Sequence, residues 1–342
     1  MTTQQIIIGN SNNLNTIPAS SVQLIVTSPP YPMIEMWDDD FCQQDPSIKL
    51  ALDAGDSSTA YNKMHNILNE TWKECDRVLT DNGFICINIG DATRTINNKF
   101  QLYPNHAQII SFFQSKGYSV LPDIHWRKPS NSPNKFMGSG MYPAGAYVTY
   151  EHEYILIFRK GEKRTFTGKG KDKRQKSAYF WEERNIWFSD LWDVKGTSQK
   201  ISKSNSTRNR NASYPFEIPY RLINMYSAED DTILDPFAGL GTTCLACMAA
   251  QRNSINVEIN PEIANLALEN ISVTPDKLNN IIEARLSKHI QFIETLPIEK
   301  QEKCYDNLYH NFKVKTKQET KIKIDKLASI NIINNIVECT YE

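Results

Sequence analysis

Two stretches of the chain combine residues that could bind a ligand with a strand that would hold them. The first is Ser28, Pro29, Pro30 and Tyr31, which follow the apolar run 22–26. Because two successive prolines lack a backbone N–H, a strand over 22–26 must leave its sheet here. The turn would hold the Ser28 hydroxyl and the Tyr31 ring at the carboxyl end of a strand, where open α/β sheets bind ligands. Taken alone, these residues fit a plain strand stop with an exposed aromatic ring equally well.

The second stretch begins with an apolar strand that ends at Asp235 and continues into a turn with Gly239 and Gly241 before a predicted helix. The next strand, 254–258, ends at Glu258. A glycine turn followed by an acidic residue at the next strand end is the geometry that binds a nucleoside cofactor. The glycines would let the backbone approach the ligand, and the N-terminus of the following helix suits a carboxylate.

Together the two stretches resemble the DNA amino-methyltransferases, which use S-adenosylmethionine. Residues 28–31 resemble their catalytic motif and residues 235–242 their cofactor motif, and the catalytic motif comes first, as in the permuted class called beta. The resemblance covers about residues 5–270. It implies an α/β fold: a Rossmann-like methyltransferase sheet in circularly permuted order, with an inserted target-recognition region and a C-terminal extension. The strands ending at Asp235 and Ser28 would then be neighbours, so that cofactor and target base meet there.

The resemblance also implies roles for individual residues. Ser28 Oγ and the Pro29 carbonyl would accept the hydrogens of an exocyclic amine, Pro30 would help to fix them, and Tyr31 would stack on a base flipped out of the duplex. On the cofactor side Glu258 would bind the ribose hydroxyls. The full set of expected cofactor residues is Asp235, Phe237, Gly239, Gly241, Thr242, Glu258 and Ile259.

The target atom is predicted from Ser28. Adenine enzymes of the family usually carry Asp or Asn at this position, and cytosine-N4 enzymes usually carry Ser. The hydroxyl could also donate to the ring nitrogen beside the amine, and with no strong base in the motif the proton would leave to water. The resemblance thus implies a cytosine-N4 DNA methyltransferase, with a cognate restriction endonuclease as its expected partner. Adenine-N6 methylation and an inactive DNA-binding relative remain the alternatives.

Charge is distributed unevenly along the chain. The net charge is −1, but residues 160–210 carry fourteen Lys or Arg against six Asp or Glu, a balance of +8, which leaves −9 for the rest. Aromatic residues are interleaved with these charges, so segment 161–210 is predicted to contact double-stranded DNA through residues such as Arg174, Lys176 and Arg184. A solvated insertion with a small aromatic core would have the same composition.

The bulk composition narrows the class of protein. A chain of 342 residues with 40% hydrophobic and 23% charged residues is typical of a soluble globular protein, and no apolar run is long enough to cross a membrane. Seven scattered cysteines fit a reducing compartment, which predicts a cytoplasmic protein. Cys244 and Cys247 are interpreted as small residues of a helix, and no metal site is expected.

Four parts are predicted along the chain. Residues 1–160 would form the catalytic half, 161–210 the target-recognition insertion, 211–272 the half that binds S-adenosylmethionine, and 273–342 a C-terminal extension without assigned chemistry. Within the first part, residues 32–58 show no clear periodicity and are predicted to be a long irregular loop.

Overall fold

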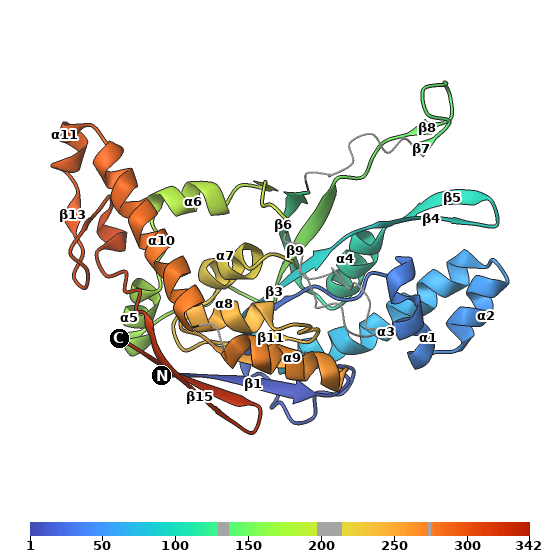
Figure 1. The fold of residues 1–342 in the computed structure, drawn as a ribbon, viewed down its shortest axis with the longest axis horizontal. Coiled ribbons are helices and arrows are strands. Elements are labelled where there is room, and N and C mark those ends of the chain that lie inside the picture. The colour runs from blue at the N-terminus through green and yellow to red at the C-terminus, as the bar shows by residue number, and fades with distance from the viewer. Residues whose placement is uncertain (129–136, 197–213, 273–274) are drawn as a thin grey trace.

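The structure is a computed structural model that describes residues 1–128, 137–196, 214–272 and 275–342. Its centre is a ten-stranded sheet in the order β10-β6-β9-β3-β2-β11-β12-β1-β16-β15 (Figure 1). The strands of this sheet are β1 (Thr2–Ile8), β2 (Val22–Thr27), β3 (Leu79–Ile89), β6 (Ser119–Arg127), β9 (His152–Arg159), β10 (Leu191–Trp192), β11 (Thr232–Asp235), β12 (Asn253–Glu258), β15 (Leu327–Ile333) and β16 (Ile336–Tyr341).

The five middle strands β1, β12, β11, β2 and β3 run parallel, and β9 and β16 run antiparallel to their neighbours on either side. Strands β11 and β12 from late in the chain lie between β1 and β2 from its beginning, with Leu24 opposite Ile233. The predicted Rossmann-like sheet in permuted order is confirmed. Because β2 and β11 are adjacent and parallel, their carboxyl ends bring Ser28 beside Asp235.

Helices cover both faces of the sheet, which explains why β2 is apolar at four of its six positions. On one face Leu24 and Val26 pack against α7 (Glu217–Tyr226) and α8 (Thr242–Ala250), with α9 (Pro261–Ser272) and α10 (Pro275–Thr295) in the same apolar cluster. On the other face Ile25 packs with α3 (Ser57–Val78) and α4 (Asn105–Ser115). Successive side chains of β2 therefore point alternately into two buried apolar clusters.

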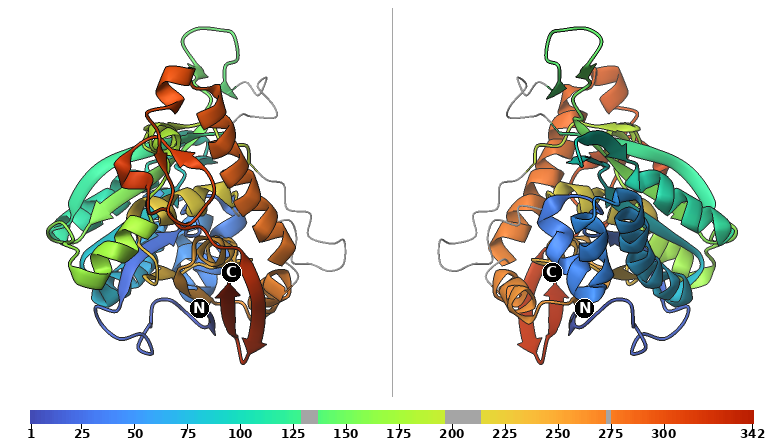
Figure 2. Two further views of the ribbon diagram at one scale, coloured as in Figure 1. Left: turned by 90° about the vertical axis from the view of Figure 1, so that its left-hand side faces the viewer. Right: turned by 90° about the vertical axis from the view of Figure 1, so that its right-hand side faces the viewer.

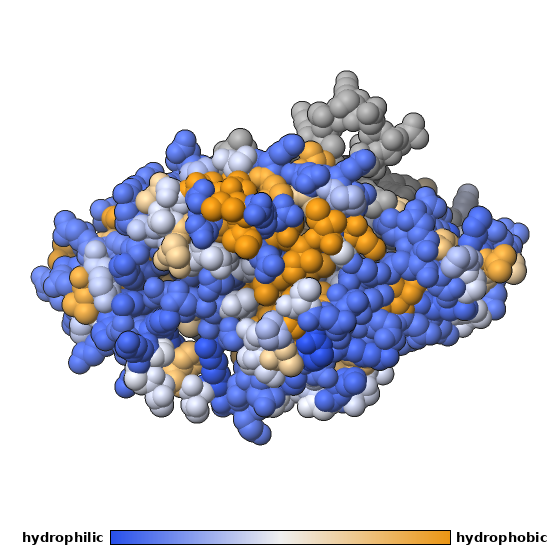
Figure 3. All heavy atoms as spheres, turned by 90° about the horizontal axis from the view of Figure 1, so that it is seen from below, coloured by the Kyte–Doolittle hydropathy of each residue, from blue (hydrophilic) through white to orange (hydrophobic). Residues whose placement is uncertain are grey.

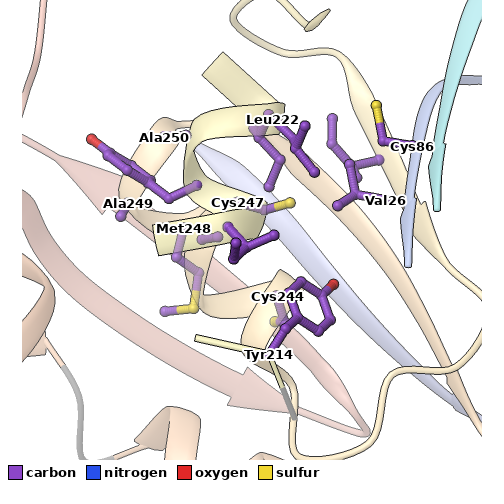
Figure 4. Close-up of a cluster of buried hydrophobic side chains, with 14 of the residues drawn as sticks. Val26, Cys86, Tyr214, Leu222, Cys244, Cys247, Met248, Ala249 and Ala250 are labelled. Atoms are coloured by element: carbon purple, nitrogen blue, oxygen red, sulfur yellow. The ribbon is translucent and has the colours of Figure 1, made fainter. Parts of the chain in front are cut away.

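Cys244 and Cys247 lie on α8 within the first of these clusters (Figure 4). Both side chains are fully buried among apolar neighbours such as Val26 and Leu222. Burial raises the pKa of the Cys244 thiol to about 12, so the thiol stays protonated and inert. The two cysteines serve as small core residues of the helix.

The segment 32–58 is not an irregular loop, so this prediction is wrong. It contains η1 (Glu35–Trp37) and two short helices, α1 (Asp38–Gln44) and α2 (Ser47–Asp53). Phe41, Ile48 and Ala51 are buried in the cluster that contains α3. Each helix spans only about two turns, too few for a periodic pattern to stand out in the sequence.

The C-terminal part extends the central sheet. After α10 come α11 (Ile298–Gln301), β13 (Tyr305–Asp306), β14 (Lys313–Val314) and η2 (Lys317–Glu319). The hairpin β15–β16 then pairs with β1, with Thr3 opposite Glu338, so the two chain ends lie side by side (Figure 1, Figure 2). Apolar side chains gather on the face of the molecule that contains β1 and this hairpin (Figure 3), and Ile8, Ile333 and Ile336 are exposed.

Two hairpins and two helices lie at opposite ends of the sheet. The hairpins β4 (Ala92–Ile96) with β5 (Lys99–Tyr103) and β7 (Met137–Gly138) with β8 (Ala146–Tyr147) project beyond the carboxyl ends of the parallel strands (Figure 1). At the other end lie α5 (Gly168–Lys176) and α6 (Trp181–Trp187), joined to the C-terminal part by a cluster of Phe180, Val314 and Ile322. No helix of the described ranges is long and apolar enough to cross a membrane.

Candidate active site

The glycine turn after β11 leaves open space beside its backbone. Gly239 and Gly241 have φ values of +52° and +80°, a conformation that other residue types rarely adopt. A Cβ atom at Gly239 would meet nothing within 4 Å, whereas one at Gly241 would lie 3.4 Å from the Cβ of Ala267. Gly241 caps α8, which begins at Thr242. A ligand can therefore approach the backbone at Gly239, and the helix N-terminus favours negative charge there.

Glu258, the last residue of β12, brings a carboxylate to this turn. Its Oε2 accepts a hydrogen bond from the backbone N–H of Gly239 at 2.9 Å, and its Oε1 accepts one from the N–H of Asn260 at 2.9 Å. Because a carboxylate can accept about four hydrogen bonds, Glu258 can hold the hydroxyl groups of a sugar while it steadies the glycine turn.

Two apolar residues of the predicted cofactor site lie close to these elements in the sequence but differ in exposure. Phe237 is half-buried, and its ring meets that of Trp72 edge to face with the centroids 5.9 Å apart. Ile259 is 56% exposed directly after β12. The core thus holds Phe237 in place, whereas Ile259 offers apolar surface to a ligand.

Asp235 is buried and joins the two halves of the site. The hydroxyl of Thr27, the residue before Ser28, donates to Asp235 Oδ1 at 2.6 Å, and the Thr243 hydroxyl donates to Oδ2 at 2.5 Å. The backbone N–H of Phe237 donates to Oδ1 at 3.0 Å. Burial raises the pKa of Asp235 to about 6, although the three hydrogen bonds act in the opposite direction and lower it. The carboxyl group therefore ties the strand of the catalytic motif to the cofactor turn and to α8.

Residues of the catalytic motif form a hydrogen-bonded group at the end of β2. The Tyr31 hydroxyl donates to Glu153 Oε2 at 2.8 Å and lies 3.2 Å from Ser28 Oγ. Burial, and next the charge of Glu153, raise the pKa of Tyr31 well above its usual value. Pro29 is buried, while Ser28 and Pro30 are partly exposed. The hydroxyl of Tyr31 is therefore anchored, which fixes the orientation of its ring.

Three residues of this group were not identified from the sequence. Asn88, near the end of β3, donates through Nδ2 to the Tyr31 hydroxyl at 2.8 Å and to Glu153 Oε2 at 2.7 Å. Glu153 lies on β9, and Lys128, which follows β6, forms an ion pair with its Oε1. A carboxylate that interrupts an apolar strand was the available signal for Glu153, since a buried charge needs partners.

The three basic residues predicted to bind DNA lie away from the catalytic motif. Arg174 and Lys176 belong to α5, which is held by an ion pair between Lys173 and Asp230. Asp230 lies two residues before β11, so α5 lies where the parallel strands begin, at the opposite end from the catalytic motif. Arg184 belongs to the neighbouring α6. The remainder of the predicted insertion, from residue 197, lies outside the described residues.

Comparison with known proteins decides the family. A family model described as DNA methylase matches residues 22–269, which include both motifs. The chain belongs to the DNA methylase family. The type II methyltransferase M.MthZI of Methanothermobacter thermautotrophicus is 51% identical over 326 residues, covering 94% of this chain and 90% of that protein. M.MjaI, a type II methyltransferase of Methanocaldococcus jannaschii, is 46% identical over 289 residues, covering 81% and 94%.

Solved structures support the fold of this DNA methylase. The protein TTHA0409 of Thermus thermophilus, complexed with S-adenosyl-L-methionine, superposes with a TM-score of 0.60 at 29% identity, covering 79% of this chain and 93% of that one. The cytosine-N4-specific PvuII DNA methyltransferase superposes with a TM-score of 0.52 at 18% identity, covering 84% and 94%. At that identity the PvuII likeness shows the fold alone.

The cofactor of the DNA methylase is S-adenosylmethionine. The residues present fit it, because the space beside Gly239 admits a ligand and Glu258 supplies acceptors for hydroxyl groups. The start of α8 provides backbone donors for a carboxylate. Within the described residues, no group of three or more His, Cys, Asp or Glu side chains is placed to hold a metal ion.

Proposed function

We propose that this DNA methylase is a beta-class enzyme that methylates the exocyclic N4 amine of cytosine in double-stranded DNA. The observation that carries the proposal is Ser28 at the carboxyl end of β2, next to the cofactor strand β11. A hydroxyl at this position can accept a hydrogen of the amine without a negative charge. The order of the two motifs supports the class.

The chemistry follows from what the side chains at this end of the sheet can hold. Bound S-adenosylmethionine supplies the methyl group. Ser28 Oγ and the Pro29 carbonyl accept the two hydrogens of the amine, which favours the form whose lone pair is available to react. The base must leave the duplex to reach them, and the anchored ring of Tyr31 offers a surface for stacking. The roles of Asp235, Gly239 and Glu258 in cofactor binding belong to this proposal.

The biological setting is proposed from the relatives. M.MthZI and M.MjaI are type II methyltransferases, and this chain covers at least nine tenths of each. We therefore propose a restriction-modification system in the cytoplasm, with a restriction endonuclease that cuts the same unmethylated site.

DNA recognition by segment 161–210 is also proposed, on its surplus of basic charge. In the described part of this segment, Arg174, Lys176 and Arg184 lie at the end of the sheet opposite the catalytic motif. Contacts there would hold phosphates far from the target base, while the hairpins β4–β5 and β7–β8 project at the end where Ser28 lies. Phosphate contacts add affinity without reading sequence.

The test is mass spectrometry of nucleosides from DNA treated with the purified protein and S-adenosylmethionine. We expect N4-methylcytosine. N6-methyladenine without N4-methylcytosine would favour the second candidate, adenine methylation by the same architecture, and no modified base in any DNA would favour an inactive relative. Ser28→Ala should bind the cofactor normally and lose most turnover, so full activity in that variant would remove Ser28 from the mechanism.

A further inference from the structure

We propose that Glu153 is a positioning residue that acts through Tyr31 on Ser28 and takes up the proton that the target amine loses. This inference rests on the proposed function and adds to it a destination for the proton. It also assigns a direction to the hydrogen bonds that join Ser28, Tyr31 and Glu153.

Glu153 lies where three donors converge. It is 9% exposed on β9, and its Oε2 accepts from the Tyr31 hydroxyl at 2.8 Å and from Asn88 Nδ2 at 2.7 Å. Its Oε1 pairs with the ammonium group of Lys128. A carboxylate so nearly buried needs such partners to remain charged, and here two of them connect it to the catalytic motif.

The number of hydrogens available fixes the direction of the two hydrogen bonds that lead from Ser28 through Tyr31 to Glu153. A carboxylate only accepts, so the single hydroxyl hydrogen of Tyr31 is used toward Glu153. The 3.2 Å contact between Ser28 Oγ and the Tyr31 oxygen must then use the hydrogen of Ser28. Ser28 then has no hydrogen left for a ring nitrogen. Its Oγ accepts a hydrogen bond from Asn88 Nδ2 at 3.4 Å and keeps a second lone pair for the amine. This differs from the sequence-based expectation that Ser28 can donate to the base.

The backbone of Gly90 lies close to both Tyr31 and Glu153. A Cβ atom at Gly90 would lie 2.9 Å from Cε2 of Tyr31 and 3.3 Å from Cγ of Glu153. Only glycine allows the ring and the carboxylate to sit so close to the end of β3. The raised pKa of Tyr31 keeps its hydroxyl protonated. The hydroxyl can therefore pass one proton on only as it receives another.

The proton transfer balances at each atom. When the amine nitrogen has formed its bond to the methyl carbon, it carries a positive charge. Its N–H bond breaks as Ser28 Oγ takes the proton, the former hydroxyl proton of Ser28 passes to the Tyr31 oxygen, and the former hydroxyl proton of Tyr31 passes to Glu153 Oε2. Ser28 and Tyr31 end neutral as they began, the base loses its charge, and the carboxylate becomes a carboxylic acid. Glu153 keeps 9% of its surface exposed, so the carboxylic acid can release the proton to water afterwards.

The test compares Glu153→Gln with the parent chain in single-turnover methylation of DNA. The amide keeps the shape and an acceptor but cannot hold the proton, so we expect a rate lower by about 100-fold, the lower end for loss of acid–base assistance. Glu153→Asp should recover part of the rate. The solvent isotope effect of the parent should disappear in Glu153→Gln, which a purely structural role would not produce. Glu299→Gln, an exposed glutamate on α11, is the matched control.

Two further measurements separate the outcomes. If Glu153 acts through Tyr31, adding Glu153→Gln to Tyr31→Phe should lower the rate no further. In the chain without cofactor, the effects of the same two substitutions on the urea midpoint of unfolding should also be less than additive. A parental rate in Glu153→Gln, or fully additive effects, would overturn the inference while methylation by the parent still stands. Absence of methylation by the parent would instead refute the proposed function.

Discussion

Thr27→Val is predicted to remove a hydrogen bond between β2, which precedes the catalytic motif, and β11, which precedes the cofactor turn. The Thr27 side chain is buried, and its hydroxyl donates to Asp235 Oδ1 at 2.6 Å. Valine keeps the β-branched shape that suits a strand but removes this donor. Because hydrogen bonds to charged groups contribute about 1.5–3 kcal/mol, the free energy of unfolding should fall by that amount at pH 8, where Asp235 is ionised.

Equilibrium unfolding in urea measures this loss. Thr93→Val, at an exposed position of β4, is the matched control and should change the free energy of unfolding by less than about 0.5 kcal/mol. At pH 4.5, where most of Asp235 is protonated, the cost of Thr27→Val should shrink because the acceptor is then neutral. If Thr27→Val matches the control at pH 8, the bond to Asp235 does not hold the two strands together and the reasoning fails.

Three other predictions address the cofactor, pH and DNA. Glu258→Ala should weaken S-adenosylmethionine binding by about 1–3 kcal/mol, since it removes the acceptor at the glycine turn; unchanged affinity in calorimetry would contradict the assignment. Burial raises the folded-state pKa of Asp235 from 3.8 to about 6, so the stability contributed by its protonated form is present below pH 4 and is lost as the pH rises through 6. Asp235→Asn should remove that slope, about 2–3 kcal/mol between pH 4 and 7, and a slope that survives in the variant would show that other groups cause it. Neutralising Arg174, Lys176 and Arg184 together should weaken DNA binding and flatten its salt dependence; an unaltered salt slope in a folded variant would place the phosphate contacts elsewhere.

Two local motifs in the sequence, through the family resemblance that they carry, were enough to predict the fold and the cofactor of this DNA methylase. The strand stop at Pro29 and Pro30, the turn with Gly239 and Gly241, and the acid at Glu258 each lie within a few residues of the strand that holds them. Backbone restrictions of proline and glycine act over that range, so they can be recognised without knowing the rest of the fold. The buried strand β2 was predicted for the same reason.

Other features depended on residues that meet only after folding. Glu153 reaches Tyr31 across 122 positions of the chain, because β9 and β3 pair beside β2. The position of α5 far from the catalytic motif and the addition of β15–β16 to the sheet edge were likewise decided by packing and strand pairing. Charge and composition carry no information about such distances, because burial and hydrogen-bond satisfaction are properties of the assembled sheet. The sequence thus determined which chemistry the chain can support, and the tertiary structure decided which side chains form hydrogen bonds with Ser28 and Tyr31.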